Sequence, residues 1–384
     1  MRELFQKKDS ITKNIEDKLI SLNAAQKVDS FENLIKEVAK LSYIHKDWLL
    51  FFRGQNCDHR NSRNSKSTFL PSIYRTKKGT LPEKERTSRF SILEGASHIL
   101  VKLLERKNIS GHQDVKLRKE IQWSILQHYE VCDTPYLDLT QSLRVACLFA
   151  TLSYNQKIGD KEIEVNPDQG YIFVFALPYI TNRISINSEQ DLINIRLLSI
   201  CPPAALRPHH QEGYLVGTTN IAEDYTMKHE LDFNRRLIAK FEFKNDDEFW
   251  GKDKLPSKID KELLYPIEDS IREICLTIRN IKESGVFEAP IKKFNILWKE
   301  LETLITPLAP NKKSVKEKLD DLRSNHNIDV LELKDIRELC VFKDKLYNEV
   351  SFSQKQILDK YLILYLLKEQ IEENKARIIA NVKK

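Results

Sequence analysis

The chain has 384 residues, 41% apolar and 31% charged, which is typical of a soluble globular protein with a sizeable core. Its 62 basic and 56 acidic side chains leave a net charge of +6, too small an excess to indicate nucleic-acid binding by itself. Only 10 glycines argue against collagen-like and glycine-loop nucleotide-binding architectures. No apolar run reaches the roughly 18–20 residues that span a bilayer. The opening segment MRELFQKKDS also lacks the apolar core of a signal peptide, so we expect a cytoplasmic protein without membrane contact.

The six cysteines lie far apart in the sequence, at positions 57, 132, 147, 201, 275 and 340. None belongs to a CxxC pair, and the neighbouring His209 and His210 lack the second spaced ligand pair of a zinc site. We therefore expect buried free thiols in a reducing compartment and no metal.

The N-terminal third begins with helical patterns and then turns to a strand. Ile11, Ile15, Leu19 and Leu22 form one apolar stripe, and Ser30 is a plausible cap of a second helix. The apolar run of residues 48–52 predicts a buried strand that ends at Arg53-Gly54. An arginine there needs either a carboxylate, such as that of Asp138, or an anionic ligand.

A polar, basic stretch from Asn56 to Lys78 follows this strand. A solvated loop is one interpretation, and contact with a nucleotide or a nucleic-acid backbone is the other. The second interpretation requires steep salt dependence of binding and its loss on Lys/Arg→Ala changes. The basic residues and histidine concerned are His59, Arg60, Arg63, Lys66, Arg75, Lys77 and Lys78.

The stretch from Ile121 to Leu152 combines three patterns around which the chain is organised. It predicts an amphipathic helix ending near Glu130, a short strand at residues 136–140, and a second helix that Ser142 caps. Such a unit either aims polar side chains from a rigid base or is an ordinary core segment. His128 and Tyr129 fit both a base with a stacking face and a satisfied structural pair.

Four strand patterns and a polar loop occur between residues 171 and 243. Residues 171–177 are the clearest buried strand, and Ser199-Ile200-Cys201 predicts another short one. A polar loop over residues 207–213 then runs into a strand, and residues 236–243 predict one more.

Helical patterns take over after these strands. A helix at residues 267–281 closes the region, and beyond Gly285 charged helices follow at residues 290–305, 314–323, 332–350 and 353–382. The last helix has a wide apolar face, which indicates either packing against more than one neighbouring helix or an oligomer contact. The expected fold is α+β: a mixed, mostly antiparallel sheet of about five to seven short strands wrapped by helices, with an all-helical C-terminal extension. We expect a helical arm at 1–29, an α+β domain at 30–284 and a helical domain at 285–384.

Several sequence blocks resemble the FRG domain, a family with an aromatic-Arg-Gly signature near its start. Here that signature is Phe52-Arg53-Gly54-Gln55, and the central QHY and LDLTQSLRVACLFA segments lie at residues 127–129 and 137–150. Further similar blocks are Leu70–Arg75, Pro202-Pro203 and Arg207 with Gln211-Glu212-Gly213. The resemblance extends over roughly residues 30–281.

The order of these blocks also resembles the ADP-ribosyltransferase superfamily, which implies an ADP-ribosyltransferase-like fold with NAD as substrate. The resemblance implies that Arg53 holds a phosphate or ribose of NAD, and that Thr140 or Ser142 orients a late acid. Glu212 or Gln211 would then stabilise the oxocarbenium-like charge as nicotinamide leaves. The spacing of Gln211-Glu212-Gly213 departs from the transferase pattern.

The candidate residues therefore fall into two sets. Those with an expected catalytic role are Glu212, Gln211, His128 and Thr140. Those expected to bind a ligand are Arg53, Gly54, Gln55, Tyr129, Asp138, Ser142, Arg207 and Gly213.

Two functions follow from the resemblance. One is an NAD-dependent ADP-ribosyltransferase or NAD-cleaving effector of a prokaryotic toxin or anti-phage defence system. The alternative is a non-enzymatic sensor module that binds a nucleotide or a protein, with the C-terminal helices transmitting the signal. The expected partners are a nucleotide or NAD, a protein or nucleic-acid target, and another copy of the chain.

Overall fold

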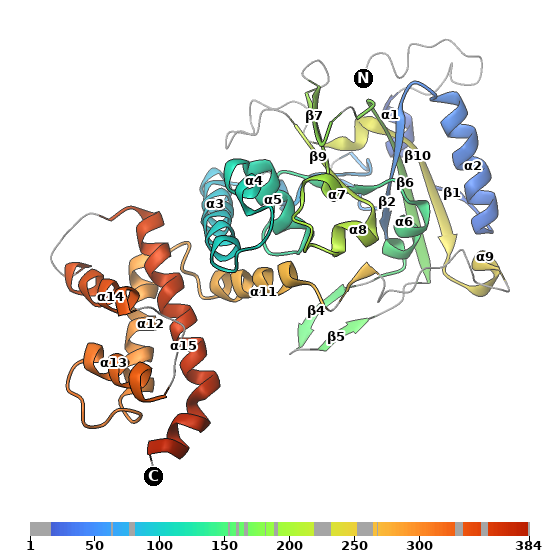
Figure 1. The fold of residues 1–384 in the computed structure, drawn as a ribbon. Helices are drawn as coiled ribbons and strands as arrows, with labels where there is room; N and C mark the ends of the chain where they lie inside the picture. Colours follow the sequence, from blue (N-terminus) through green and yellow to red (C-terminus); the bar gives the residue numbers. More distant parts are fainter. Residues whose placement is uncertain are drawn as a thin grey trace. The chain divides into compact units, whose positions relative to one another are not determined.

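The chain forms two compact units (Figure 1). The structure, a computed structural model, describes residues 17–62, 64–76, 81–152, 154–158, 161–164, 168–180, 182–187, 191–218, 232–251, 264–266, 268–326, 333–346 and 352–382. The first unit takes its described residues from 1–87 and 109–272, and the second from 88–108 and 273–384. The second unit thus includes residues 88–108, which the sequence-based ranges assign to the α+β part; those ranges stay a prediction.

An eight-stranded sheet is the frame of the first unit, in the order β1-β10-β6-β2-β3-β9-β8-β7. Among these strands only β1 and β10 pair in parallel. The strands are β1 (Gln26–Lys27), β2 (Leu49–Gln55), β3 (Leu137–Thr140), β6 (Gln169–Leu177), β7 (Ile184–Asn187), β8 (Leu192–Arg196), β9 (Gly213–Gly217) and β10 (Leu237–Lys244). β4 (Tyr154–Ile158) and β5 (Lys161–Glu164) form a separate pair. The α+β class with a mixed, mostly antiparallel sheet is confirmed, with more strands than predicted.

Each face of the sheet has its own apolar core, because successive side chains of a strand point to opposite faces. Phe52, Ile172 and Val174 belong to the core that includes side chains of three helices, α2 (Phe31–Ile44), α6 (Leu143–Ala150) and α9 (Asp247–Trp250). Phe51 and Phe173 belong to the opposite core, which also contains Phe69 and Phe233 from segments outside the sheet. Burial on both faces explains why residues 171–177 are apolar throughout.

The sheet is nearly divided in two between β2 and β3. β2 pairs with β6 along all seven of its residues, and β3 pairs with β9 along all four of its own. β2 and β3 themselves pair only at Phe52 and Thr140. Beyond that single bridge the two strands separate, so their facing backbone groups and the neighbouring side chains border an opening.

Two local predictions were wrong. Ser199-Ile200-Cys201 was expected to be a strand, but residues Leu197–Ile200 form the short helix α7, closed by a hydrogen bond from the Cys201 N–H to the Leu197 carbonyl (3.0 Å). The strand of this region is β8, just before it, where Leu192, Ile193 and Ile195 are buried. The polar loop expected at 207–213 contains a second short helix, α8 (Arg207–Gln211).

The remaining elements of the first unit surround the sheet. They are α1 (Asp17–Leu22), a 3₁₀ turn at Ser72–Tyr74, α4 (His112–Leu117), α5 (Lys119–His128) and a second 3₁₀ turn at Phe233–Arg236. The N-terminal helix expected around residues 11–22 lies partly outside the described residues, which include its end as α1. The central helix, strand and second helix are present as α5, β3 and α6.

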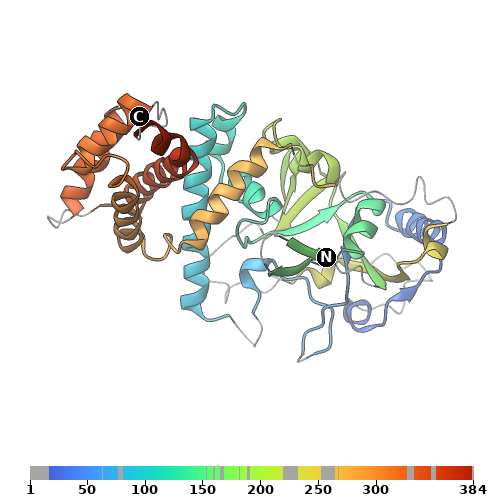
Figure 2. The same ribbon diagram turned by 90° about the horizontal axis from the view of Figure 1, so that it is seen from below.

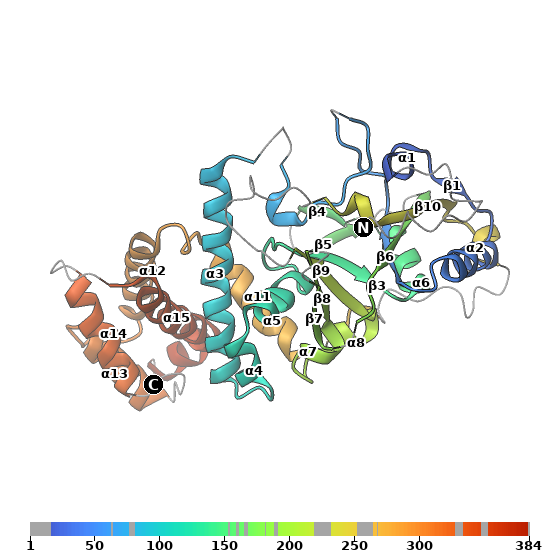
Figure 3. The ribbon, with the colours of Figure 1, turned by 90° about the horizontal axis from the view of Figure 1, so that it is seen from above.

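The second unit is helical in its described residues, as predicted for the C-terminal region. α3 (Glu83–Arg106) and α11 (Ser270–Glu283) contribute most of their lengths to it. The other helices are α12 (Pro290–Ile305), α13 (Val315–His326), α14 (Leu333–Leu346) and α15 (Gln354–Val382). α12 and α15 lie side by side (Figure 2, Figure 3). Among the described residues no helix is both long and apolar enough to cross a membrane.

All six cysteines are free thiols. Cys147 and Cys275 are buried as expected, whereas Cys57 is exposed.

Candidate functional site

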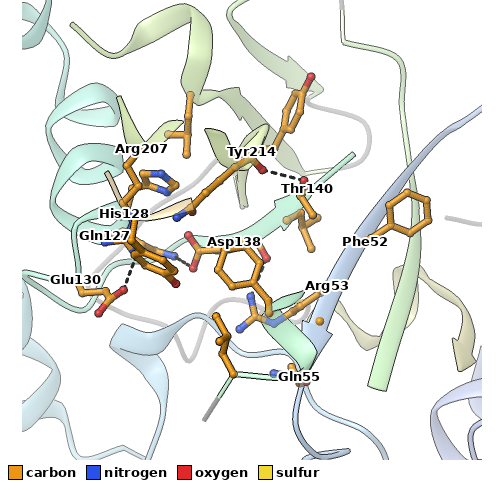
Figure 4. Close-up of a pocket in the computed structure, with 18 of the residues that line it drawn as sticks. Phe52, Arg53, Gln55, Gln127, His128, Glu130, Asp138, Thr140, Arg207 and Tyr214 are labelled. Atoms are coloured by element: carbon orange, nitrogen blue, oxygen red, sulfur yellow. Dashed lines mark hydrogen bonds and ion pairs between the residues drawn. The ribbon is translucent and has the colours of Figure 1, made fainter. Parts of the chain in front are cut away.

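A pocket of about 560 Å³ lies where β2 and β3 separate (Figure 4). Its wall brings together residues that are up to 213 positions apart in the chain (Phe52 and Tyr265), including residues from β2, β3, the end of α5, α8 and the start of β9. The candidate residues that line it are Arg53, Gly54, Gln55, His128, Asp138, Thr140, Arg207, Gln211 and Gly213. Tyr129, Ser142 and Glu212 are not among the lining residues. Their roles, like those of the lining residues, stay predictions.

Arg53 stands inside β2, since the strand ends at Gln55, one residue beyond the predicted end at Arg53-Gly54. The side chain is half-buried, and its Nη1 donates to the backbone carbonyl of Asp138 at 2.7 Å. That carbonyl belongs to the part of β3 that has left β2, so the guanidinium takes the place of a strand partner. Burial, together with repulsion from Arg75, lowers the pKa of Arg53 to about 10, so the side chain stays cationic at neutral pH. Its Nε is buried and has no hydrogen-bond partner among the described residues.

The expected salt bridge from Arg53 to the Asp138 carboxylate is replaced by this bond to the Asp138 backbone. The carboxylate instead accepts a hydrogen bond from the amide of Gln127 at 2.7 Å. Gln127 also donates to the backbone carbonyl of Tyr136 (3.2 Å). The Arg53 charge is therefore only partly compensated by the protein.

The residues of the aromatic-Arg-Gly signature face alternate sides of β2 and therefore have different environments. Phe52 is in the core beside Ala146, and Arg53 points to the other face of the strand and into the pocket. Gly54 faces α6 so closely that a Cβ would lie 1.7 Å from the Ala146 carbonyl oxygen and 2.7 Å from the Ala150 nitrogen. Since both atoms are backbone, only glycine fits there. The glycine sets how close α6 lies to β2, and the arginine faces the ligand space.

The hydroxyl of Thr140 forms hydrogen bonds with the surrounding backbone both as a donor and as an acceptor. Its hydroxyl donates to the carbonyls of Gln211 (3.0 Å) and Glu212 (3.2 Å), and it accepts from the Ser142 N–H (3.1 Å). Ser142 occupies the N-cap position of α6 as predicted, but its own hydroxyl makes no capping bond. Thr140 therefore ties the turn after α8 to the start of α6, which is a positioning role.

Gln211 and Glu212 differ in orientation. Gln211 is buried and its amide donates to the Leu264 carbonyl (2.9 Å). Glu212 is exposed and has a left-handed backbone with φ 45°. Its negative charge helps to raise the pKa of Tyr214, after the larger effect of burial. The carboxylate implied by the transferase resemblance thus lies outside the pocket lining.

His128 and Tyr129 end α5 and have separate environments. The Tyr129 hydroxyl donates to Asp269 at 2.6 Å. Asp269 also accepts from the backbone N–H groups of Leu206 (3.1 Å) and Ile271 (2.9 Å), so Tyr129 belongs to a structural network. His128 is 6% exposed and lines the pocket. Burial, with repulsion from Arg207, lowers its pKa to about 3, so the imidazole is neutral at physiological pH.

Arg207 is held at the pocket by rings and by a carboxylate. Its guanidinium carbon lies 4.5 Å from the ring centre of Tyr265 and 5.8 Å from that of Tyr129, and its Nη2 pairs with Glu130. Tyr265 and Glu130 themselves line the pocket. Cation–π contact and an ion pair together fix the side chain in one place.

Several lining residues were not among the sequence-predicted candidates, notably Gln127, Glu130 and Tyr265. Gln127 is part of the QHY segment, whereas nothing in the pattern around Tyr265 indicated a site. The described residues of the basic stretch after β2 fall into two groups, those that line the pocket and those that bond elsewhere in the protein. His59 and Arg75 line the pocket, whereas Arg60 pairs with Asp58 and donates to the carbonyls of Leu22 and Asn23.

The pocket therefore offers three guanidinium groups, those of Arg53, Arg75 and Arg207, against the carboxylates of Asp138 and Glu130. This arrangement suits an anion that carries hydrogen-bonding groups. Among the described residues no cluster of three or more His, Cys, Asp or Glu side chains is placed to hold a metal ion.

Comparison with known proteins adds one match. Residues 49–158 match the FRG domain family, a span that begins with β2 and contains α5, β3 and α6. The other pocket segment, from Arg207 to Gly213, and Tyr265 lie beyond it. No curated protein and no solved structure matches the chain. The matched span, which contains the aromatic-Arg-Gly signature and its helical partner α6, is therefore similar to the FRG domain.

Proposed function

We propose that the pocket binds a phosphate-bearing nucleotide, with NAD as the first ligand to test. The observation that carries this proposal is Arg53: a half-buried guanidinium whose only hydrogen bond among the described residues is to a backbone carbonyl, with Nε left buried and unpaired. An arginine on a sheet strand without a bonded carboxylate is costly for folding alone. An anionic ligand would remove that cost, and the planar fork of arginine matches a phosphate.

The size and lining of the pocket support a ligand larger than a bare anion. A volume of about 560 Å³ falls within the roughly 300–1,000 Å³ of small-molecule sites. Phe149, Tyr214 and Tyr265 offer aromatic surface on which a base or nicotinamide ring would stack. Arg75 and Arg207 supply further positive charge for a diphosphate.

The test is titration calorimetry of the purified chain with NAD, ADP-ribose and ATP. Arg53→Ala is expected to weaken binding about 10- to 150-fold, the equivalent of a charge-assisted hydrogen bond. Arg183→Ala removes an exposed arginine beside the edge strand β7 and outside the pocket lining, and is expected to leave the affinity unchanged. Equal affinities of the wild type and Arg53→Ala would refute the proposal, as would failure of all three nucleotides to bind at millimolar concentration.

A second candidate is cleavage of NAD, as in an ADP-ribosyltransferase or an NAD-consuming effector. It is favoured by the presence of two carboxylates, Asp138 and Glu130, in the lining. Developing positive charge on the ribose needs a nearby anion, and Asp138 is the carboxylate that lies next to Arg53 in the fold. In this version Asp138, and not the exposed Glu212, stabilises the transition state.

Release of nicotinamide from NAD distinguishes the two candidates. Turnover that is abolished by Asp138→Asn and retained in Glu212→Gln would support the enzyme with Asp138 in that role. Loss in Glu212→Gln alone would return the role to the residue that the transferase resemblance implies. Binding without turnover would support a sensor. In a toxin or anti-phage defence system the chain would then act as an effector or as a sensor, with the C-terminal helices contacting a protein target or a second copy.

A further inference from the structure

His128 is a buried polar side chain on the pocket wall that the proposed nucleotide binding does not yet use. It is 6% exposed, and its ring lies edge-on to that of Tyr129, with 5.9 Å between ring centres. Gly213 makes room for it, because a Cβ at that position would lie 3.3 Å from His128 Cε1. In Figure 4 the ring lies beside Arg207, on the opposite side of Asp138 from Gln55.

The imidazole Nε2 is buried and has no partner among the described residues. The Arg207 backbone favours a proton on the ring, so we assign the hydrogen of the neutral ring to Nδ1. In a neutral imidazole one nitrogen carries the hydrogen and the other accepts, so Nε2 is left as an unsatisfied acceptor.

A neutral hydrogen-bond acceptor favours a ligand group that is a hydrogen-bond donor. Phosphate oxygens carry no proton to donate at neutral pH, so Nε2 does not favour the anionic part of a ligand. Ribose hydroxyls are donors, and in a nucleotide they stand next to the phosphate groups. In the pocket, the neutral acceptor His128 lies next to the cation Arg207. This pair matches a ribose hydroxyl next to a phosphate group in the ligand.

We propose, on the basis of the nucleotide binding inferred above, that His128 Nε2 accepts a hydrogen bond from a ribose hydroxyl of the ligand. His128 is then a specificity-determining residue that selects ribonucleotides over deoxyribonucleotides. The buried amide oxygen of Gln55, also without a partner among the described residues, is a second acceptor on the other side of the pocket. The site thus combines cations for the phosphates with neutral acceptors for the sugar.

The experiment compares the affinities of ADP, 2′-deoxy-ADP, 3′-deoxy-ADP and inosine diphosphate for the wild-type chain. One deoxy analogue is expected to bind about 5- to 100-fold more weakly than ADP, because it leaves a buried acceptor unpaired. Equal affinities of ADP and both deoxy analogues would overturn the inference. Weakening by inosine diphosphate alone would also overturn it, since the donor would then be the adenine amino group.

Variants of His128 assign the effect to this side chain. His128→Phe is expected to reduce the ratio of ADP to deoxy-ADP affinity to about one while binding stays sensitive to Arg53→Ala. His128→Asn keeps a neutral acceptor and is expected to restore part of the discrimination. A ratio unchanged in His128→Phe would refute the role of His128. Because the analogue comparison uses the wild type, it stands even if a variant fails to fold, and absence of all nucleotide binding would instead refute the proposed function.

Discussion

Two walls of the pocket differ in how their polar atoms are satisfied. We use "closed wall" for Thr140, Gln211 and the Ser142 backbone, where each of these groups bonds to the protein itself. We use "open wall" for Arg53, Gln55 and His128, which each have a buried polar atom without a partner among the described residues. Buried polar groups are nearly always hydrogen-bonded in folded proteins, so the exceptions need an explanation.

The difference indicates separate roles for two sets of polar residues that the sequence had assigned to one site. The closed wall holds the strands and helices around the pocket in place. The unpaired atoms of the open wall add no hydrogen bond to that frame, and under the proposed function they face the ligand. Substitutions in the frame should therefore lower stability, whereas substitutions in the open wall should lower binding.

The largest loss of stability is expected for Gly54→Ala. Its Cβ would lie 1.7 Å from the Ala146 carbonyl oxygen and 2.7 Å from the Ala150 nitrogen. Both are backbone atoms, so neither can move without shifting α6 or β2. Overpacking of this kind costs about 1–3 kcal/mol and more where backbone must shift, so we expect at least 3 kcal/mol in chemical denaturation. Gly251→Ala, whose Cβ meets no described atom within 4 Å but whose φ of 84° and ψ of 159° favour glycine, should cost about 1–3 kcal/mol. A cost for Gly54→Ala no larger than that control would contradict the close-contact explanation.

Thr140→Val tests the closed wall. The substitution removes one hydroxyl that serves two carbonyls and one N–H, and is expected to lower the free energy of unfolding by about 2–3 kcal/mol. Thr140→Ser keeps the hydroxyl and should lose less than half of that amount. Equal losses in the valine and serine variants would contradict this role of the hydroxyl, because serine keeps the hydroxyl and valine does not.

The pH dependence of stability tests the open wall through His128. Its pKa is about 3 in the folded chain and about 6.5 when unfolded, so between these values the unfolded chain binds the additional proton. Stability should therefore fall as the pH falls through this window, by about 2 kcal/mol from pH 7.5 to pH 5. His128→Gln should remove this contribution while every other histidine stays in place. Parallel pH profiles of the two chains would show that His128 is not held neutral.

Ser142→Ala is expected to have the smallest effect. The Ser142 hydroxyl makes no capping bond, and its N–H, which does bond to Thr140, is backbone and survives the substitution. We expect a change in the free energy of unfolding below about 0.5 kcal/mol, against the roughly 1 kcal/mol of an ordinary serine cap. A larger loss in thermal or chemical denaturation would mean that the hydroxyl caps α6 in solution.

Much of the fold was predictable because it depends on local patterns. The run of residues 171–177 predicted β6, and the apolar stripe of residues 290–305 predicted α12. β8 was missed and α7 was taken for a strand. The alternation of apolar and polar residues is short in both segments, residues 192–196 and 197–201. The burial of Leu192 and Ile195 in the folded chain decides that the first segment joins the sheet.

The residues of the pocket were largely visible in the sequence, but their individual situations were not. Arg53, Thr140 and Gln211 were singled out together, and the structure brings them to one pocket. The left-handed backbone at Glu212 and the orientation of its side chain away from the lining could not be read from its neighbours. Tyr265 reaches the pocket from a segment that showed no pattern of a site.

The sequence by itself determined the α+β class, the helical C-terminal region and a signature in which an arginine stands between a core aromatic and a glycine. Each of these follows from short-range periodicity or from one residue's chemistry. Only the tertiary structure decided which polar atoms are satisfied and which have no partner among the described residues. The reason is that a hydrogen-bond partner such as the Gln211 carbonyl for Thr140 is 71 residues away, and no local pattern encodes that distance.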